Sequence, residues 1–417
     1  MLLYINQFRG FNDTYLYLNK TNFLVGENST GKTTLLSLIK LLSTREFWHT
    51  LHFNMQDIEL GYGSEIISHQ ATTAFFEIAA FDTLTTNTSA IIAYYLRFQL
   101  ENNEPRLIQY CFQAHQNNFM VAIQKEQYQY TIQTTTNEID SLYTFKQWVE
   151  EVREHKAVQE KNLTPMPLFL LHSALLAKTN TTLPYNEMIL PIFLNDLTWI
   201  APIRTKPQRI YENYKLNFTP EGEHTPYLLQ LLLNNGEFQT LIEKFGADSG
   251  LFEQIQIKPL NNEKNAPFEI HITLNDKPLK ITNVGYGISQ ILPILVETIA
   301  RKSTTCFAIQ QPEVHIHPKG QAALGELLYY LSQHDNKSFI IETHSDFIID
   351  RYRLLLRKQH RHQNLTTSDA QVLFFERTAS GNQIHIIPID TQGDYADNTP
   401  PSFKDFFIKE ELALLSY

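Results

Sequence analysis

Short apolar runs separated by polar segments predict a succession of strands and helices along this chain. Near the N-terminus, residues 2–5 and 15–18 have the pattern of strands, and Asn22-Phe23-Leu24-Val25 has that of a short buried strand. The apolar residues of 35–42 predict a buried helix directly afterwards. Asn and Thr clusters then separate three strand-like runs, at 74–78, 91–96 and 128–132. The region from 71 to about 135 therefore predicts an antiparallel sheet.

The pattern changes to a helical period in the middle of the chain. Residues 145–161 place four apolar side chains on one face of a helix: Phe145, Trp148, Val149 and Val152. A mixed polar and apolar helical stretch continues to about residue 191. Because no heptad repeat is sustained there, the stretch does not predict a long coiled-coil arm.

Two further buried strands are expected in the C-terminal half, at 304–309 and 338–342. Both end in polar residues, and a helix follows each of them. This pattern is typical of a parallel sheet whose ligand lies beyond the carboxyl ends of its strands. We also expect a helix that includes Ile288 to Ile299, in which Pro293 is tolerated because it lies near the helix start.

The clearest chemical motif runs from Gly26 to Thr34 and fits the pattern G-x-x-x-x-G-K-[ST] of a phosphate-binding P-loop. The expected strand before it and helix after it supply the context that the motif needs. Its glycines let backbone N–H groups turn towards phosphate oxygens, and the positive end of the helix dipole lies there too. The expected nucleotide-binding residues are Gly26, Asn28, Ser29, Thr30, Gly31, Lys32, Thr33 and Thr34. Among them, Lys32 is expected to reach the β- and γ-phosphates, and Thr33 to ligate Mg²⁺.

Three downstream stretches add candidate residues. The first is Gly285-x-Gly287-x-Ser289 at a helix start; alone it is a weak signal that a plain tight turn also explains. The second is Gln310-Gln311-Pro312-Glu313-Val314-His315-Ile316-His317-Pro318, and the third is Thr343-His344-Ser345-Asp346. On a strand, His315 and His317 would share a face, but no cysteine or acidic cluster completes a zinc site beside them.

Composition and charge narrow the class of protein. The 417 residues carry a formal charge of −10, which argues against a surface covered in DNA-binding charge. The sequence has two cysteines that lie far apart, and it shows neither a signal peptide pattern nor an apolar run long enough to cross a membrane. These features predict a reduced, cytoplasmic protein.

Two groups of cations have alternative explanations. Arg204 and Arg209 follow an apolar strand at 197–200, and they either present charge to phosphate or pair with the acidic surface. A later helix carries a basic group that either binds nucleic acid or, as we favour, forms a solvated face: Arg351, Arg353, Arg357, Lys358 and Arg361.

Taken together and in this order, the motifs resemble those of ABC-class P-loop ATPases of the RecF, SMC and OLD group. They resemble in particular the Septu-type defence ATPases called PtuA. The phrases that carry the resemblance are I-N-Q-F-R-G-F before the P-loop, W-I-A-P-I-R, E-G-E-H-T-P-Y, G-x-G-x-S-Q at the signature position, Q-Q-P-E-x-H-x-H-P at Walker B, and E-T-H-S at the switch histidine. Residues 100–190 show no recognised motif.

The resemblance implies an α/β fold with an ABC-type ATPase head, in which a mixed sheet with flanking helices is joined by an antiparallel β subdomain, and a mainly helical insert. The boundaries that follow are 1–138 for the N-terminal lobe with the P-loop, 139–195 for the helical insert, and 196–417 for the C-terminal lobe with the signature-like loop, the Walker B-like strand and the switch histidine.

The resemblance also assigns roles at an ATP and Mg²⁺ site. Gly285, Gly287 and Ser289 would face the γ-phosphate of a second subunit, and His344 would sense the γ-phosphate of its own. Gln310 and Gln311 occupy the places of the usual Walker B carboxylates. Gln310 would lie in the metal shell together with Thr33. Glutamine cannot act as a general base, so turnover is in doubt; Glu313, Glu342 and Asp346 are the nearest carboxylates in sequence.

Three functions remain open from the sequence. The first is an ATP-dependent switch, a homodimer or higher oligomer, that regulates a separately encoded effector, a nuclease or a toxin, in anti-phage defence. No Toprim nuclease motif follows His344, which is why the effector is expected on another chain. The alternatives are a RecF-like repair ATPase that acts directly on DNA, and an ATP-binding scaffold that does not hydrolyse ATP.

Overall fold

The computed structural model divides into two compact units. Unit 1 comprises Met1–Asn19, Glu27–Asn195 and Phe375–His385, and unit 2 comprises Lys20–Gly26, Asp196–Phe374 and Ile386–Tyr417. The described residues are 1–55, 57–71, 73–81, 91–114, 116–154, 161–179, 194, 197–212, 214–263, 266–363, 368–397 and 399–403. Residues 139–195, which we expected as a separate insert, fall within unit 1 in this division.

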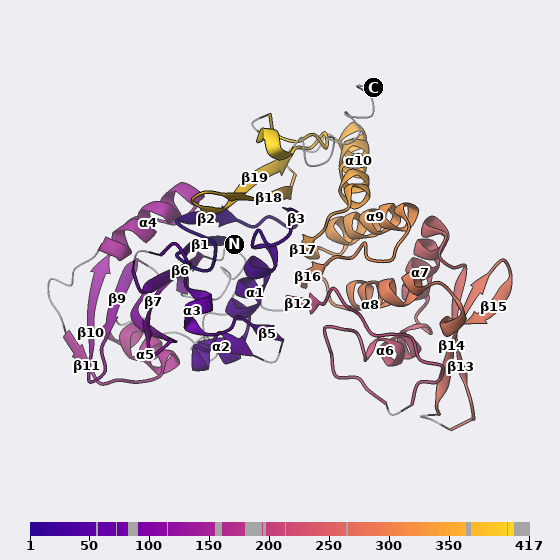
Figure 1. Cartoon of the computed structure of the whole chain (residues 1–417), viewed down its shortest axis with the longest axis horizontal. Coiled ribbons are helices and arrows are strands. Elements are labelled where there is room, and N and C mark those ends of the chain that lie inside the picture. Colours follow the sequence, from indigo (N-terminus) through magenta and orange to yellow (C-terminus); the bar gives the residue numbers. More distant parts are fainter. Residues whose placement is uncertain are drawn as a thin grey trace. The chain divides into compact units, whose positions relative to one another are not determined.

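An eight-stranded antiparallel sheet forms the centre of unit 1, with the order β11-β10-β9-β8-β7-β6-β1-β2 (Figure 1). Its strands are β1 (Leu2–Asn6), β2 (Thr14–Tyr17), β6 (Phe75–Phe81), β7 (Ile91–Glu101), β8 (Glu104–Ala114), β9 (Asn117–Ile123), β10 (Tyr128–Thr134) and β11 (Lys161–Leu163). The antiparallel sheet predicted from the strand-like runs is therefore confirmed.

Two long strands of this sheet, β8 and β9, were not predicted. Asn102 and Asn103 join β7 to β8 in a two-residue turn, and both have positive φ, at 52° and 66°. Asparagine tolerates this left-handed conformation, which a tight hairpin turn requires. The pair Asn-Asn was thus a hairpin signal in the sequence.

For the helices of unit 1, the sequence predicted the residues of the apolar face better than the residues at which a helix ends. These helices are α1 (Lys32–Leu42), α2 (Arg45–Thr50), α3 (Gly63–Ile66), α4 (Leu142–Glu154) and α5 (Leu168–Leu176), beside a short ladder of β4 (Asn54–Met55) and β5 (Ile58–Glu59). Phe145, Trp148, Val149 and Val152 of α4 enter one buried cluster with Tyr4 of the sheet, as their spacing predicted. The predicted extension of this helix to Lys161 is wrong, because Lys161 begins β11 and pairs with Tyr130 of β10. The remainder of the predicted helical stretch, at 155–160 and 180–191, lies outside the described residues.

A six-stranded sheet with the order β12-β16-β17-β3-β18-β19 lies mostly in unit 2, while residues 375–385, at the hairpin of its last two strands, are assigned to unit 1. Its strands are β3 (Thr21–Gly26), β12 (Leu197–Ile200), β16 (Cys306–Gln310), β17 (Ser338–Glu342), β18 (Ala370–Thr378) and β19 (Gly381–Ile389). The pairs β12–β16, β16–β17 and β17–β3 are parallel, as the two buried strands of the C-terminal half predicted. Only Ala379 and Ser380 join β18 to β19, so these neighbouring strands form an antiparallel hairpin and the sheet is mixed.

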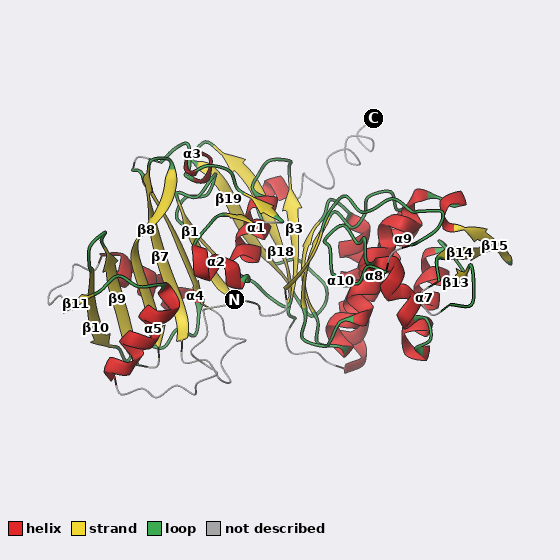
Figure 2. Ribbon diagram, turned by 90° about the horizontal axis from the view of Figure 1, so that it is seen from below, coloured by secondary structure: helices red, strands yellow, loops and turns green. Residues whose placement is uncertain are grey.

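The helices of unit 2 labelled in Figure 2 lie to one side of this second sheet, and a three-stranded sheet lies apart from it beyond α7. The helices of unit 2 are α6 (Thr225–Leu232), α7 (Gly236–Ser249), α8 (Tyr286–Ala300), α9 (Pro318–His334) and α10 (Asp346–Gln363), and the small sheet consists of β13 (Gln254–Pro259), β14 (Phe268–Leu274) and β15 (Lys277–Lys280). The α/β class with a mixed sheet, flanking helices and a separate antiparallel sheet is confirmed.

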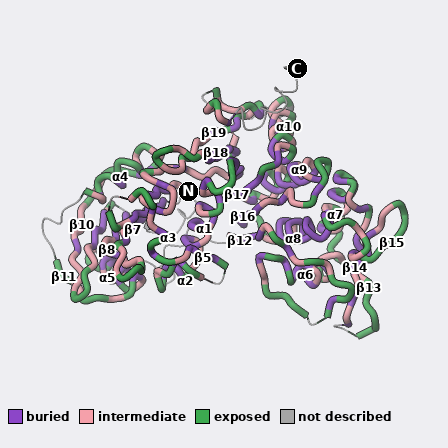
Figure 3. The backbone as a smooth tube through the Cα atoms, viewed as in Figure 1, coloured by how far each residue is buried: buried purple, intermediate pink, exposed green. Residues whose placement is uncertain are grey.

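Helix α8 is the central helix of unit 2 and is buried over most of its length (Figure 3). Pro293 is its eighth residue and lies in the helix interior, so the expectation that it lies near the start is wrong. Proline lacks the N–H that would bond to the carbonyl of Ser289, four residues earlier. The Pro293 ring packs instead against Gly222, where an added Cβ would lie 2.7 Å from it.

Candidate functional site

The P-loop lies between the end of β3 and the start of α1, and its residues from Glu27 onwards belong to unit 1. Strand β3 ends at Gly26 and α1 begins at Lys32, as the motif predicted. Ser29 and Gly31 have φ of 61° and 98°, so the backbone twice enters the left-handed region. A Cβ on Gly31 would lie 2.5 Å from the ring of Phe11, so glycine is required there for both its φ and its size.

The loop is held in shape by its own carbonyl groups. The Lys32 side chain is buried, and its Nζ donates to the Glu27 carbonyl at 2.6 Å. Thr30 Oγ1 donates to the same carbonyl at 2.8 Å, and Arg377 Nη2 donates to the carbonyl of Ser29 at 2.6 Å. Within the part of the chain that the structure describes, no side chain caps the N-terminus of α1. A preformed loop with a buried cation and an uncapped helix start fits a phosphate chain.

The strand ends of unit 2 bring a second set of candidate residues together. Gln310 is buried at the end of β16, directly opposite Glu342 at the end of β17. Gln310 Nε2 donates to Glu342 Oε2 at 3.0 Å. Gln311 follows with φ of 43°, and its N–H donates to the Glu342 carbonyl at 2.8 Å. The Walker B-like strand, β16, therefore ends in the amide of Gln310 at a position where the motif usually has a carboxylate. The neighbouring strand, β17, ends in the carboxylate of Glu342.

Glu313 links the turn after β16 to the predicted switch residue. One of its carboxylate oxygens accepts from Thr343 Oγ1 and the other from the backbone N–H of His344, both at 2.8 Å. The His344 side chain is exposed. Glu313, a candidate catalytic carboxylate, thus holds the backbone turn that presents His344; we call residues Thr343 and His344 the switch turn.

The signature-like loop packs against the same turn of unit 2. A Cβ on Gly287 would lie 2.6 Å from the carbonyl oxygen of His315, so glycine permits this close approach. The Tyr286 and His315 rings make an edge contact, with 5.2 Å between centroids. Ser289 is buried and its Oγ donates to the Tyr286 carbonyl at 2.7 Å. Gly285, in contrast, has open space around it.

The two histidines considered for zinc do not lie on a strand. His315 has φ of 64° within the turn between β16 and α9 and packs on Tyr286. His317 is the N-cap of α9, and its Nδ1 accepts from the Lys319 N–H at 3.3 Å. Both residues therefore shape the turn.

The Arg204 side chain is buried inside unit 2. Neither of the two interpretations of the sequence, contact with phosphate or pairing with the acidic surface, predicted this burial. Arg204 is 2% exposed, and its Nη2 donates to the carbonyls of Gln310 and Gln311, at 2.8 and 3.3 Å. Its own carbonyl accepts from Gln290 Nε2, in the first turns of α8, at 3.4 Å. Burial lowers the pKa of Arg204 to about 10, and the negative charge of Glu313 opposes this shift. The only signal for it in the sequence was an arginine directly after an apolar strand and a proline.

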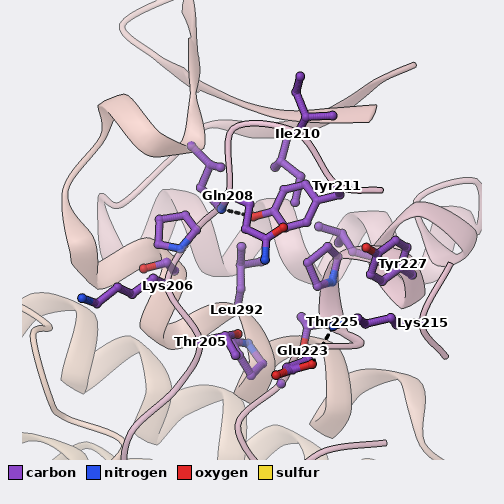
Figure 4. Close-up of a pocket in the computed structure, with 18 of the residues that line it drawn as sticks. Thr205, Lys206, Gln208, Ile210, Tyr211, Lys215, Glu223, Thr225, Tyr227 and Leu292 are labelled. Atoms are coloured by element: carbon purple, nitrogen blue, oxygen red, sulfur yellow. Dashed lines mark hydrogen bonds and ion pairs between the residues drawn. The ribbon is translucent and has the colours of Figure 1, made fainter. Parts of the chain in front are cut away.

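A pocket of about 530 Å³ lies beside the signature-like loop (Figure 4). Ser289, Leu292 and Pro293 of α8 form part of its wall, and the segment 205–215 forms another. Several of its polar groups pair with each other: Tyr211 OH accepts from the Gln208 N–H, and Lys215 pairs with Glu223 at 2.8 Å. The pocket thus lies between part of α8 and the segment that follows Arg204.

The predicted basic helix, α10, uses most of its arginines within unit 2. Arg351 pairs with Glu326 at 2.9 Å, and Arg353 pairs with Asp350 at 2.8 Å. Arg357 pairs with Asp394, with 2.5 Å between Nη2 and Oδ1. These contacts favour the interpretation as an ordinary surface over that as a nucleic-acid site.

The sequence profile of one protein family matches most of the chain. The profile of the AAA ATPase domain family matches residues 1–183 and 201–349. The chain belongs to the AAA ATPase domain family. The matched residues of this ATPase domain include the P-loop, Arg204, the signature-like loop, the turn after β16 and the switch turn.

Three SMC heads of known structure are similar to this ATPase domain over most of its length. The SMC head bound to the C-winged helix domain of ScpA is 10% identical with a TM-score of 0.44, over 92% of this chain and 96% of that one. The SMC head domain from Thermotoga maritima is 10% identical with a TM-score of 0.38, over 93% and 98%. The SMC head with an extended coiled coil bound to the C-terminal domain of ScpA, from Pyrococcus furiosus, is 10% identical with a TM-score of 0.37, over 99% and 98%. Likeness at this level says nothing about function.

The comparison with curated proteins found no match. Among the described helices of this ATPase domain, none combines the length and the apolar character that crossing a membrane requires.

Proposed function

We propose that this chain is an ATP-dependent dimeric switch that regulates a separately encoded effector, a nuclease or a toxin, in defence against phage. The preformed P-loop, with Lys32 buried inside it, is the observation that carries the nucleotide-binding part of this proposal. The membership of the AAA ATPase domain family supports it. The defence role rests on the motif resemblance to Septu-type ATPases.

The chain's own residues suggest how ATP would be bound. Lys32 would exchange the Glu27 carbonyl for phosphate oxygens, because a charge-assisted bond to phosphate is stronger than one to a neutral carbonyl. The N–H groups at the start of α1 would donate to the same phosphates. Thr33 and Gln310 would lie in the Mg²⁺ shell. Bound ATP with Mg²⁺ would supply a γ-phosphate that water can attack.

The side chains at the ends of β16 and β17 favour slow turnover. Gln310 already uses its amide N–H on Glu342, and Gln311 has no group that can accept a proton from water. A slowly hydrolysed nucleotide keeps a complex in one state for longer, which suits a switch. A scaffold that does not hydrolyse ATP at all is the limiting case of this proposal.

A second copy of the chain would complete the nucleotide site. Gly285 and Ser289 would face the γ-phosphate bound by the partner, in a closed two-fold dimer. The open space around Gly285 supports an approach from outside at this point of the loop.

The mass of the protein in solution tests binding and dimerisation together. Wild type with Mg²⁺ and a non-hydrolysable ATP analogue should be a dimer at micromolar concentration. Lys32→Ala should bind the analogue at least about tenfold more weakly, since a charge-assisted bond is lost, and should stay monomeric. Lys258→Ala, which removes an exposed lysine of unit 2, is the matched control and should behave as wild type.

Two results would contradict the proposal. A wild-type chain that binds the analogue but stays monomeric would contradict the proposed dimer. If Lys32→Ala binds the analogue as tightly as wild type does, the proposed nucleotide site is wrong. The effector role is tested separately by the efficiency of phage plating on cells that express the chain with the genes beside it. Loss of protection in Lys32→Ala is expected.

The RecF-like alternative has less support. Its specific motivation was the basic group on α10, and Arg351, Arg353 and Arg357 are paired with carboxylates. Strongly salt-dependent binding of double-stranded DNA by the purified chain would favour this alternative.

A further inference from the structure

Arg204 is a buried cation whose hydrogen bonds are incomplete. Its Nη2 serves the carbonyls of Gln310 and Gln311, but Nε and Nη1 are also buried. Among the residues that the structure describes, none accepts a hydrogen bond from either of these two atoms. A buried charged group with unmet donors is costly and stays in a fold only where something else requires it.

A carboxylate near Arg204 is already engaged elsewhere. Glu313 is close enough for its charge to raise the pKa of Arg204 against the effect of burial. Both Glu313 oxygens nevertheless accept hydrogen bonds from the switch turn, from Thr343 Oγ1 and from the His344 N–H. Arg204 therefore has free donors and Glu313 has the matching acceptor, while the two are not bonded to each other.

We propose that Glu313 has two alternative partners, the switch turn and Arg204, and that Arg204 is a positioning residue that takes over Glu313 when nucleotide is bound. This inference rests on the proposed function, because it needs ATP to act at His344. With Glu313 on the switch turn, the backbone around His344 is fixed. With Glu313 on Arg204, the buried guanidinium gains its missing acceptor and the switch turn is released.

The surroundings of Arg204 explain how such an exchange would reach other parts of unit 2. Its carbonyl accepts from Gln290 of α8, one residue after Ser289. Its Nη2 fixes the carbonyl of Gln310 and that of Gln311, whose backbone is left-handed. A new bond to Glu313 would therefore act on the signature-like helix and on the end of β16 at the same time.

Amide hydrogen exchange at His344 tests the proposal without any measurement of activity. The His344 N–H donates to Glu313, so it should exchange slowly in the nucleotide-free wild type. With Mg²⁺ and a saturating non-hydrolysable ATP analogue, exchange at this single amide should rise about tenfold or more, because a bond to a charged group is lost.

Variants at position 204 distinguish a positioning role from a merely structural one. In Arg204→Gln, His344 should stay protected when the analogue binds, because Glu313 has no second partner. Arg204→Lys keeps the charge and should restore part of the nucleotide effect, and it also serves if Arg204→Gln fails to fold. Arg209→Gln, a change of an exposed arginine in the same loop, is the matched control and should respond as wild type.

The outcomes separate this inference from the proposed function. Analogue binding is measured first by calorimetry, and a wild type that does not bind overturns both. A wild type that binds and dimerises while His344 exchange stays unchanged overturns the role of Arg204 alone. The same result follows if Arg204→Gln shows the full wild-type increase at His344.

Discussion

Glu77 in unit 1 and Arg204 in unit 2 are both buried charged residues, but their surroundings differ. Glu77 accepts from Asn6 Nδ2 and Tyr95 OH at 2.7 Å and from Tyr4 OH at 3.3 Å. Arg97 and Arg153 each place Nε 3.3 Å from its carboxylate. Burial, together with the Glu77 charge, raises the pKa of Tyr4 and Tyr95, so both phenols stay protonated as donors.

Arg204 has no comparable set of partners. One of its nitrogens bonds to two carbonyls, and the other two nitrogens find no acceptor among the described residues. A charged group whose hydrogen bonds are all formed stabilises a single arrangement. A charged group with unused donors can form further hydrogen bonds when the arrangement changes. The comparison suggests that the Glu77 carboxylate keeps a single arrangement and that Arg204, beside the strand ends of unit 2, can change its partners.

The largest effect is expected where unit 2 lacks a carboxylate. Gln311→Glu should raise ATP hydrolysis by about 10²–10⁴, the usual contribution of a general base. Gln310→Glu should give no such gain, because it would set a second carboxylate against Glu342, 3.0 Å from the present amide. Phosphate release at saturating ATP measures both. A brisk wild-type rate that Gln311→Glu leaves unchanged would show that another group activates the water.

The second effect tests the closed set of partners around Glu77. Glu77→Gln removes the negative charge that Arg97 and Arg153 share, and the free energy of unfolding should fall by about 3 kcal/mol or more. Urea unfolding measures the loss. Glu101→Gln, which removes a partly exposed acid paired with Arg106, is the control and should change stability little. A similar loss in both variants would mean that burial of Glu77 has no special effect.

The third effect concerns a buried group of unit 1 that avoids charge altogether. Burial lowers the pKa of His172 from 6.5 to about 3, and its Nε2 shares a hydrogen bond with Tyr110 OH. A folded-state pKa below the unfolded one gives stability that is complete above pH 6.5 and is lost as the pH falls towards 3. The unfolding free energy should therefore decline by up to about 1.4 kcal/mol per pH unit in this window.

Replacement of His172 isolates this contribution from that of other acidic groups. His172→Gln keeps a polar partner for Tyr110 but does not titrate, so its acid-induced loss should be shallower than in wild type. Urea unfolding at several pH values between about 4 and 7 measures the slopes. Parallel slopes in the two proteins would show that His172 becomes protonated without unfolding.

The smallest effect is expected at Arg204. Arg204→Met removes the bonds to Gln310 and Gln311, but it also removes a buried cation with unmet donors. Replacement of such a charge by an apolar side chain of similar length is often nearly neutral, so stability should change by less than about 1 kcal/mol. A loss as large as that of Glu77→Gln in the same urea experiment would remove the contrast between the two regions.

The parts of the site that follow from local spacing were predictable from the sequence. The strand, loop and helix around Lys32 depend on glycines and apolar residues within a few positions, and β3 and α1 appear where they were expected. The buried strands that end at Gln310 and Glu342 follow for the same reason. The structure adds that these two side chains bond to each other, which strand register decides and sequence alone does not.

The buried charges were not predictable, because their partners come from distant parts of the chain. Arg204 follows an apolar strand and a proline, as an exposed loop arginine would, and its acceptors lie more than a hundred residues later. Glu77 stands alone in an apolar strand, but nothing local indicates that Arg97 and Arg153 supply its counter-charges. A lone charge within a buried strand was the available signal in that case.

The discontinuity of the two units has a consequence for synthesis of the protein. Unit 1 contains residues 1–19 and 27–195 but is completed by 375–385, and the strand at 20–26 belongs to unit 2. At about 5–20 residues per second, roughly 20–80 s pass between the first residue and the last segment of unit 1. After the last strand of the eight-stranded sheet has been made, unit 1 still lacks residues 375–385, and the central strand β3 of unit 2 still lacks its neighbours β17 and β18. Chaperones that protect apolar surface and strand edges during translation should therefore influence the yield of this protein more than that of one whose units are continuous in sequence.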